Sequence, residues 1–162
     1  MEQRTPAAYV AEFIGSFALV FFITSVAVLF LAPGGGGTSD FAVVGLVNGL
    51  VLFMLVMTIG SVSGAHLNPA VTLGLAALRK IRINDAVIYI LLQLSGGVAG
   101  ALVTKFILAD TVADGTATAG GQSAEVGTPV LSDTLLGSAA AGAVAEGIGC
   151  LLYTSPSPRD RS

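Results

Sequence analysis

Apolar residues in this chain gather into long runs, and polar or glycine-rich stretches separate one run from the next. Four such runs occupy residues 8–31, 41–60, 86–108 and 135–153. Each is close to the roughly 20 residues that a helix needs to cross the hydrocarbon core of a bilayer. The pattern therefore predicts four membrane-spanning helices.

A shorter apolar stretch over residues 61–78 is interrupted by Gly64 and Pro69. It is too short to span a bilayer, and non-helical backbone at membrane depth is tolerated only where protein or water surrounds it, so the stretch predicts a re-entrant segment. Residues 32–40 and 110–133 are rich in small and polar residues and predict surface loops. The fold class expected is an all-α membrane protein with four spans and one re-entrant half-helix.

The composition agrees with a chain that faces lipid: 54% of the residues are hydrophobic and 10% are charged. A soluble domain carries about 25% charged residues. The formal net charge of -3 and the scarcity of cations argue against a nucleic-acid partner. Cys150 is the single cysteine, and no Cys/His cluster has the spacing of metal ligands, so we expect no disulfide, metal or cofactor. Glu2 and Arg4 precede a run too long for a signal peptide, which predicts a retained first span.

The distribution of cations predicts the orientation. In the four-span arrangement one side carries four basic residues, whereas the connections on the other side carry acidic residues only. The positive-inside rule places the N-terminus and the re-entrant segment in the cytoplasm, in a plasma membrane or a bacterial inner membrane. Binding of lipid head groups is the alternative use of these cations. They are Arg4, Arg79, Lys80 and Arg82.

The re-entrant segment carries the chemistry. Asn68 is placed to cap a short helix, with Pro69 in its first turn, where a missing N–H costs nothing. Gly64 allows the preceding chain to run extended, so that the carbonyls of Gly64, Ala65 and His66 face a water-filled lumen. The helix N-terminus carries a partial positive charge, and the Asn68 amide can donate to a solute oxygen, which disfavours cations. A path for small neutral solutes is predicted.

The twelve residues Ser63–Gly74, SGAHLNPAVTLG, contain an Asn-Pro-Ala tripeptide that ends at Ala70. In their place between two spans they resemble the first signature loop of the aquaporin (major intrinsic protein) family. The resemblance covers about residues 7–149 and implies an aquaporin-like inverted-repeat helical bundle, here truncated. Further matching positions are Ala11–Gly15 (AEFIG), Gln93, Gly97, Gly100 and Ala145–Gly149 (AEGIG).

The first and fourth spans begin alike, since AEFIG recurs as AEGIG at an offset of 134 residues. Three spans separate the copies, so the second copy enters the membrane from the opposite side, as in inverted repeats. The second Asn-Pro-Ala is then expected beyond Ser162. After Gly149 the resemblance stops, and Ser-Pro pairs and charges follow. We expect an aquaporin-like domain over residues 1–149 and a non-native or disordered tail over 150–162.

Placing a glutamate inside a membrane-spanning helix costs free energy, which makes Glu12 and Glu146 candidate functional residues. The family resemblance implies that such a glutamate accepts hydrogen bonds that hold a re-entrant loop, and that Glu12 braces the loop from Gly64 to Asn68. A proton relay and direct exposure to the lumen remain alternatives. Thr72 and Gln93 are assigned to the same support role, with contact to solute as the alternative.

His66 is the single histidine. We interpret it as a loop anchor whose carbonyl faces the pore; a pH gate or a metal ligand is the alternative. By the resemblance, Asn48 occupies the position of the first side chain of the outer selectivity constriction, usually an aromatic residue or histidine. An asparagine there widens the opening, or else bonds a neighbouring helix. Small and aromatic residues in the spans are expected to allow close helix packing or to face lipid: Gly45, Gly49, Gly96, Gly97, Gly100, Tyr9, Phe13 and Phe17.

These features together predict a passive channel for water and glycerol-like small neutral solutes, with a pore within each subunit of a homotetramer, as the resemblance implies. The 162-residue chain alone is expected not to conduct, because half of the lumen wall is absent. The alternative is a non-transporting membrane scaffold or assembly subunit. A coupled transporter lacks paired intramembrane charges, and an enzyme lacks a nucleophile with a positioned base, since Ser61, Ser63 and His66 have no third partner.

Overall fold

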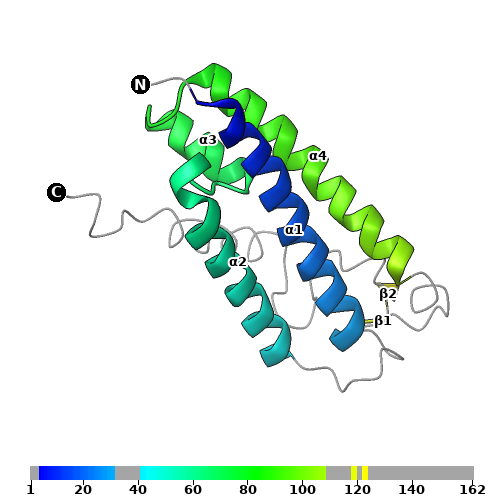
Figure 1. Ribbon diagram of the computed structural model, residues 1–162. Coiled ribbons are helices and arrows are strands. Elements are labelled where there is room, and N and C mark those ends of the chain that lie inside the picture. Colours follow the sequence, from blue (N-terminus) through cyan, green and yellow to red (C-terminus); the bar gives the residue numbers. More distant parts are fainter. Residues whose placement is uncertain (1–3, 32–40, 109–117, 120–121, 124–162) are drawn as a thin grey trace. The chain divides into compact units, whose positions relative to one another are not determined.

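The computed structural model describes residues 4–31, 41–108, 118–119 and 122–123. The regular secondary structure of the described part is helical apart from one antiparallel pair of two-residue strands (Figure 1). Its elements are α1 (Pro6–Leu31), α2 (Phe41–Ser63), α3 (Pro69–Ala77), α4 (Ile83–Ile107), β1 (Thr118–Ala119) and β2 (Gln122–Ser123).

Three of the described helices, α1, α2 and α4, are long and apolar enough to cross a membrane. They coincide with the first three predicted spans to within three residues at each end, so the prediction of an all-α membrane bundle is confirmed. The helix α4 begins before the predicted start at residue 86 because Asp85, in its first turn, is paired with Arg82 and can be buried. The fourth predicted span, residues 135–153, lies outside the described residues.

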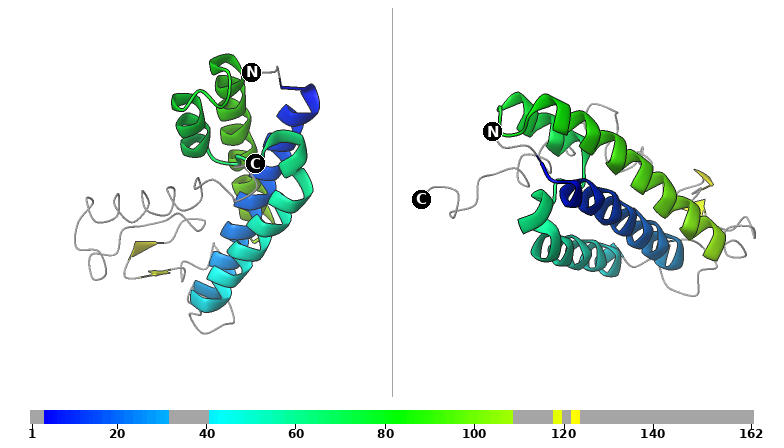
Figure 2. Two further views of the ribbon diagram at one scale, coloured as in Figure 1. Left: turned by 90° about the vertical axis from the view of Figure 1, so that its left-hand side faces the viewer. Right: turned by 45° about the horizontal axis from the view of Figure 1, so that its top comes forward.

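The helix α1 lies between α2 and α4 (Figures 1 and 2). Two glycines of α4 allow its backbone to approach that of α1 closely. A Cβ atom on Gly96 would overlap the carbonyl oxygen of Phe13, and one on Gly100 would lie 2.5 Å from that of Phe17. Both glycines are buried, so the predicted role of glycine in close helix packing is confirmed at these two positions.

A hydrogen-bonded group joins the same two helices further along. The hydroxyls of Thr24 and Thr104 lie 2.8 Å apart, and the hydroxyl of Ser25 lies 3.2 Å from that of Thr104. Threonine and serine satisfy their hydroxyls in this way across membrane helices, where water cannot reach them. The α1–α4 interface is thus built from close backbone approach and buried hydrogen bonds.

The glycines of α2 are used differently. Within the described part of the chain, a Cβ atom on Gly45 or Gly49 would meet no atom within 4 Å. The expectation that these two glycines support close helix packing is therefore wrong for the described residues, because no helix backbone lies opposite them there.

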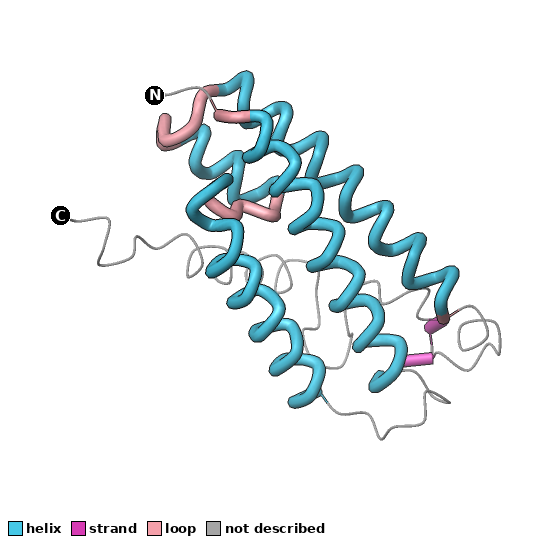
Figure 3. The backbone as a smooth tube through the Cα atoms, viewed as in Figure 1, coloured by secondary structure: helices cyan, strands magenta, loops and turns pink. Residues whose placement is uncertain are grey.

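A short loop connects α2 to α3, and Figure 3 shows it between helical segments. The helix α3 has nine residues and packs against α4. At about 1.5 Å per residue it is about 13 Å long, less than half of a hydrocarbon core of about 30 Å. The segment thus has the form of the predicted re-entrant half-helix.

Candidate functional site

The N-terminus of α3 is capped by its own sequence. Asn68 is extended, with φ -150°, and its Oδ1 accepts a hydrogen bond of 2.8 Å from the N–H of Ala70. Pro69 follows as the first helical residue, where it removes no helical hydrogen bond. Because the cap uses the amide oxygen, the group that Asn68 retains for other partners is its NH2 donor.

The loop before the cap is wound rather than extended. Gly64 has φ 91°, and the non-glycine residues Ala65 and Leu67 have φ 46° and 50°. The expectation of an extended run from Gly64 is therefore wrong. Left-handed residues turn successive N–H groups of a chain toward one point, which forms a concave binding site for an anion. The conformation of this loop follows from the anion that it binds.

That anion is the side chain of Glu12 on α1, which is fully buried. Its Oε1 accepts hydrogen bonds from the N–H of His66 at 2.9 Å and from the hydroxyl of Ser63 at 2.6 Å. Its Oε2 accepts one from the N–H of Leu67 at 2.8 Å. One carboxylate on α1 thus binds two consecutive N–H groups of the loop, beside its left-handed residues Ala65 and Leu67.

Gln93 on α4 completes this group. Its Nε2 donates to Glu12 Oε2 at 2.7 Å and lies 3.0 Å from the hydroxyl of Thr72. That hydroxyl also lies 3.1 Å from Nδ1 of His66. The structure therefore brings together four residues singled out from the sequence, from α1, the loop, α3 and α4.

Two members of the group were not expected. The hydroxyl of Ser63 also accepts a hydrogen bond of 3.0 Å from the N–H of Ala65, and the hydroxyl of Tyr89 donates to the carbonyl of Ser63 at 2.9 Å. The Tyr89 ring meets the ring of His66 edge-on, with centroids 5.1 Å apart. Two signals could have found them: the position of Ser63 next to the loop at the end of α2, and the hydroxyl of Tyr89 within a span, which needs a hydrogen-bond partner.

Burial separates the two sides of the loop. Gly64, Asn68 and Ala70 are exposed and Pro69 is half-buried, whereas the side chains of Ala65 and His66 are buried. Among these residues, the exposed surface of the loop is therefore contributed by Gly64, Asn68 and Ala70, while Ala65 and His66 are almost fully covered.

Two predicted residues lie elsewhere. Asn48 is fifteen residues before the end of α2 at Ser63, a separation of about 22 Å along a helix. Its Oδ1 is buried without a hydrogen-bond partner among the described residues. Glu146 lies outside the described residues.

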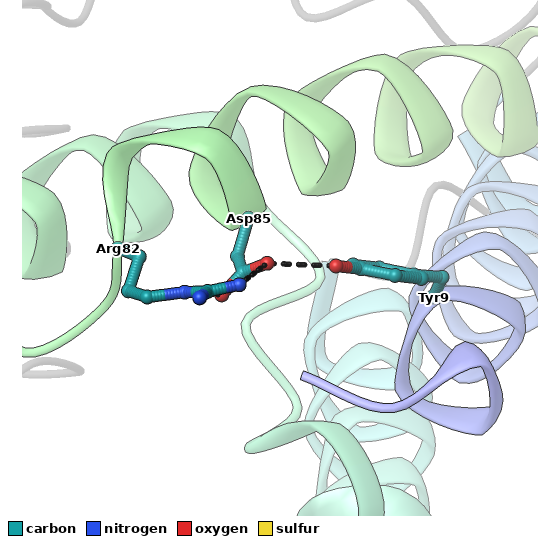
Figure 4. Close-up of polar contacts among 3 residues, drawn as sticks. All are labelled: Tyr9, Arg82 and Asp85. Atoms are coloured by element: carbon teal, nitrogen blue, oxygen red, sulfur yellow. Dashed lines mark hydrogen bonds and ion pairs between the residues drawn. The ribbon is translucent and has the colours of Figure 1, made fainter. Parts of the chain in front are cut away.

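A second polar cluster lies where α1 and α4 begin (Figure 4). Asp85 is buried and accepts hydrogen bonds from Arg82 Nε at 2.9 Å, from Arg82 Nη2 at 3.1 Å and from the Tyr9 hydroxyl at 2.7 Å. As expected, Tyr9 is a packing residue: the centroid of its ring lies 5.9 Å from that of Tyr89. Its hydroxyl also donates a hydrogen bond to Asp85.

The sequence profile of the family described as "Major intrinsic protein" matches residues 2–147. The chain belongs to the major intrinsic protein family. Aquaporin AqpM of Methanothermobacter marburgensis is 38% identical over 138 residues, which cover 76% of this chain and 54% of the relative. Probable aquaporin PIP2-7 of Oryza sativa subsp. japonica is 37% identical over 145 residues, covering 79% of this chain and 49% of the relative.

A further relative in the major intrinsic protein family is the Glycerol uptake facilitator protein-like 6 of Lactiplantibacillus plantarum. It is 40% identical over 102 residues, which cover 62% of this chain and 44% of the relative. The chain spans about half the length of these curated relatives. Membership in the family confirms the resemblance and, with the three apolar helices, an integral membrane protein.

Proposed function

We propose that the protein to which this chain belongs is a passive transmembrane channel for water and glycerol-like small neutral solutes. The observation that carries the proposal is the capped half-helix α3, whose N-terminus follows a loop bound to the buried Glu12. Relatives named as aquaporins and as a glycerol uptake facilitator-like protein support the same class of solute.

The mechanism rests on the N-terminus of α3. Its aligned peptide dipoles place a partial positive charge of about half a unit at Asn68. The NH2 group of Asn68 donates to the oxygen of a passing water or hydroxyl group, while the positive helix end repels cations and hydronium. Solute orientation and cation exclusion therefore arise from one element.

The remaining predicted residues take supporting positions in this proposal. Backbone carbonyls of Gly64, Ala65 and His66 accept hydrogen bonds from the solute, and Pro69 and Ala70 form the wall beside Asn68. Asn48 belongs to the outer constriction, where its amide leaves a wider and more polar opening than an aromatic ring. Glu12, Thr72 and Gln93 hold the loop, and Glu146 performs the corresponding task for a second loop.

The topology and assembly are part of the same proposal. The N-terminus and the α3–α4 connection lie in the cytoplasm of a plasma membrane or bacterial inner membrane, because the basic residues gather there. Each subunit of a homotetramer contains its own pore. Residues 1–149 belong to the aquaporin-like domain as its first repeat and the start of the second, an assignment that the family match over residues 2–147 supports.

The test is water and glycerol flux in vesicles that contain the complete gene product. Asn68→Asp replaces the NH2 donor with a carboxylate oxygen, and we expect water flux to fall, on the order of tenfold, or sodium to leak. Asn84→Asp is the matched control, since Asn84 is exposed in the first turn of α4 and should leave both fluxes unchanged.

Two outcomes contradict the proposal. Unchanged flux and unchanged sodium exclusion in Asn68→Asp would remove Asn68 from the mechanism. A complete gene product that inserts into vesicles but adds no water permeability would favour the non-transporting scaffold instead.

A further inference from the structure

The α3–α4 connection places an arginine where a glycine is usually found. The helix α3 ends at Ala77 with Leu78 as its C-cap, after which Arg79 N–H donates to the carbonyl of Ala76 at 3.0 Å and Lys80 N–H donates to that of Leu75 at 2.8 Å. This pair of bonds is a Schellman motif, whose central residue takes a left-handed conformation and is most often glycine. Here that residue is Arg79, with φ 54°.

A side chain in the left-handed region is sterically disfavoured. The chain nevertheless presents a long cationic side chain at this position, and backbone strain of this kind gathers where the side chain is used. The exposed side chain of Arg79 is therefore the part of the motif for which we infer a binding role.

The neighbouring cations differ in how far they are already occupied. Arg82 donates a hydrogen bond to each carboxylate oxygen of the buried Asp85 (Figure 4). Hydrogen bonding to Asp85 raises the pKa of the Arg82 guanidinium. Arg79 and Lys80 are exposed, and in the described part of the chain neither forms an ion pair. Among the described residues, Arg79 and Lys80 thus carry charges that no acidic side chain neutralises, whereas the neighbouring Arg82 is paired with Asp85.

Apolar side chains flank these two cations. Leu78 is 70% exposed and Ile83 is 68% exposed, whereas Ile81 between them is 4% exposed and fixes the connection to the bundle. A segment that carries exposed apolar side chains next to cations matches the boundary between acyl chains and head groups. This connection joins a re-entrant helix to a membrane-crossing one, so it lies at that boundary.

We propose that Arg79 and Lys80 bind the phosphate of an anionic phospholipid, with Leu78 and Ile83 against its acyl chains. The guanidinium of Arg79 can hold two phosphate oxygens at once, and Lys80 adds a point charge. The proposal does not depend on conduction, because it uses only the position of the connection at the membrane surface.

The chain contains no tryptophan, which allows a direct test. Leu78→Trp introduces a single tryptophan at an exposed position of the site. In vesicles, quenching by acyl-brominated phosphatidylglycerol is compared with quenching by acyl-brominated phosphatidylcholine. We expect preferential quenching by phosphatidylglycerol in Leu78→Trp.

In the same background, Arg79→Gly should reduce this preference roughly fivefold, as for one cation at an anionic surface, and adding Lys80→Gln should abolish it. Arg79→Lys should retain most of it. Loss of folding is distinguishable, because glycine suits the left-handed position and Arg79→Gly should melt at the same temperature or higher.

Lys105→Gln is the control: it removes one exposed cation in the last turn of α4, at the opposite end of that helix, and should leave the preference unchanged. Equal quenching by the two lipids in Leu78→Trp would overturn the proposal. So would an unchanged preference in the Arg79→Gly/Lys80→Gln variant, or a loss in Lys105→Gln equal to that in Arg79→Gly. Loss of the preference on adding inorganic phosphate would identify a site for soluble anions and overturn it as well.

Discussion

The two long neighbours of α1 resemble each other in length and apolar character and differ in how they contact it. Both α2 and α4 are apolar helices with small residues in their interior. On the α4 side, Gly96 and Gly100 meet the backbone of α1, and Gln93 meets Glu12. On the α2 side, no residue between Ala42 and Val62 is buried in the described part of the chain. A small residue therefore marks a helix contact only where a partner backbone lies opposite.

The largest expected effect comes from Glu12, the residue that joins α1 to both the loop and α4. Glu12→Ala leaves the N–H groups of His66 and Leu67 and the amide of Gln93 without their acceptor. Each unsatisfied buried donor is costly, so we expect a loss of about 3 kcal/mol or more in the free energy of unfolding. Thermal unfolding in detergent, followed by circular dichroism, measures the change.

Glu12→Gln sharpens this prediction because it retains one acceptor oxygen and should lose less stability than Glu12→Ala. Ser61→Ala removes an exposed hydroxyl near the end of α2 and serves as the control without effect. If Glu12→Ala melted at the parent temperature, the loop would be held by something other than this carboxylate.

The next effect tests close helix approach on α4. Gly96→Ala places a methyl group against the carbonyl of Phe13, and the two helices must separate to accommodate it. Overpacking of this kind costs about 1–3 kcal/mol. In Gly97→Ala, one residue away, the new methyl lies 3.4 Å from Val20, an ordinary contact, so stability should not fall. Equal melting temperatures for the two variants would contradict the close approach of α1 and α4.

The smallest effect has the opposite sign and concerns α2. The new methyl of Gly49→Ala has no atom of the described residues within 4 Å, and alanine favours a helix over glycine by about 0.5–1 kcal/mol, so the melting temperature should rise slightly. Measured on the complete gene product, the same substitution reports on the α2 face. If Gly49→Ala destabilised the complete gene product but stabilised the 162-residue chain, a partner that covers Gly49 would be identified.

The helices and the start of α3 were accessible from the sequence because their signals are local. The length of an apolar run determines whether a helix can cross a bilayer, and Asn68 followed by Pro69 marks a helix start within two residues. Glu12 and Gln93 were also identifiable, since a polar side chain inside a span needs a partner. The family resemblance then supplied the pairing of Glu12 with the loop.

The winding of the loop was not predictable in this way. Ala65 and Leu67 take left-handed conformations that their residue types disfavour, because the Glu12 carboxylate binds the N–H groups of His66 and Leu67, which lie 54 and 55 residues later in the chain. Asp85 and Tyr9 meet across 76 residues for a similar reason. Contacts of this kind depend on which helices become neighbours, and that information is spread over the whole chain.

The level at which α3 begins has a consequence for its electric field. Gln93 lies ten residues beyond the start of α4, about 15 Å along that helix, and it contacts Glu12 and Thr72 beside the first turn of α3. In a membrane with a core of about 30 Å, this places the positive end of α3 near the middle. In the proposed channel salt ions are excluded from that region, so Debye screening, which weakens surface charges over about 8 Å in physiological salt, does not act on it. The charge at the head of α3 should therefore repel cations equally in dilute and in concentrated salt.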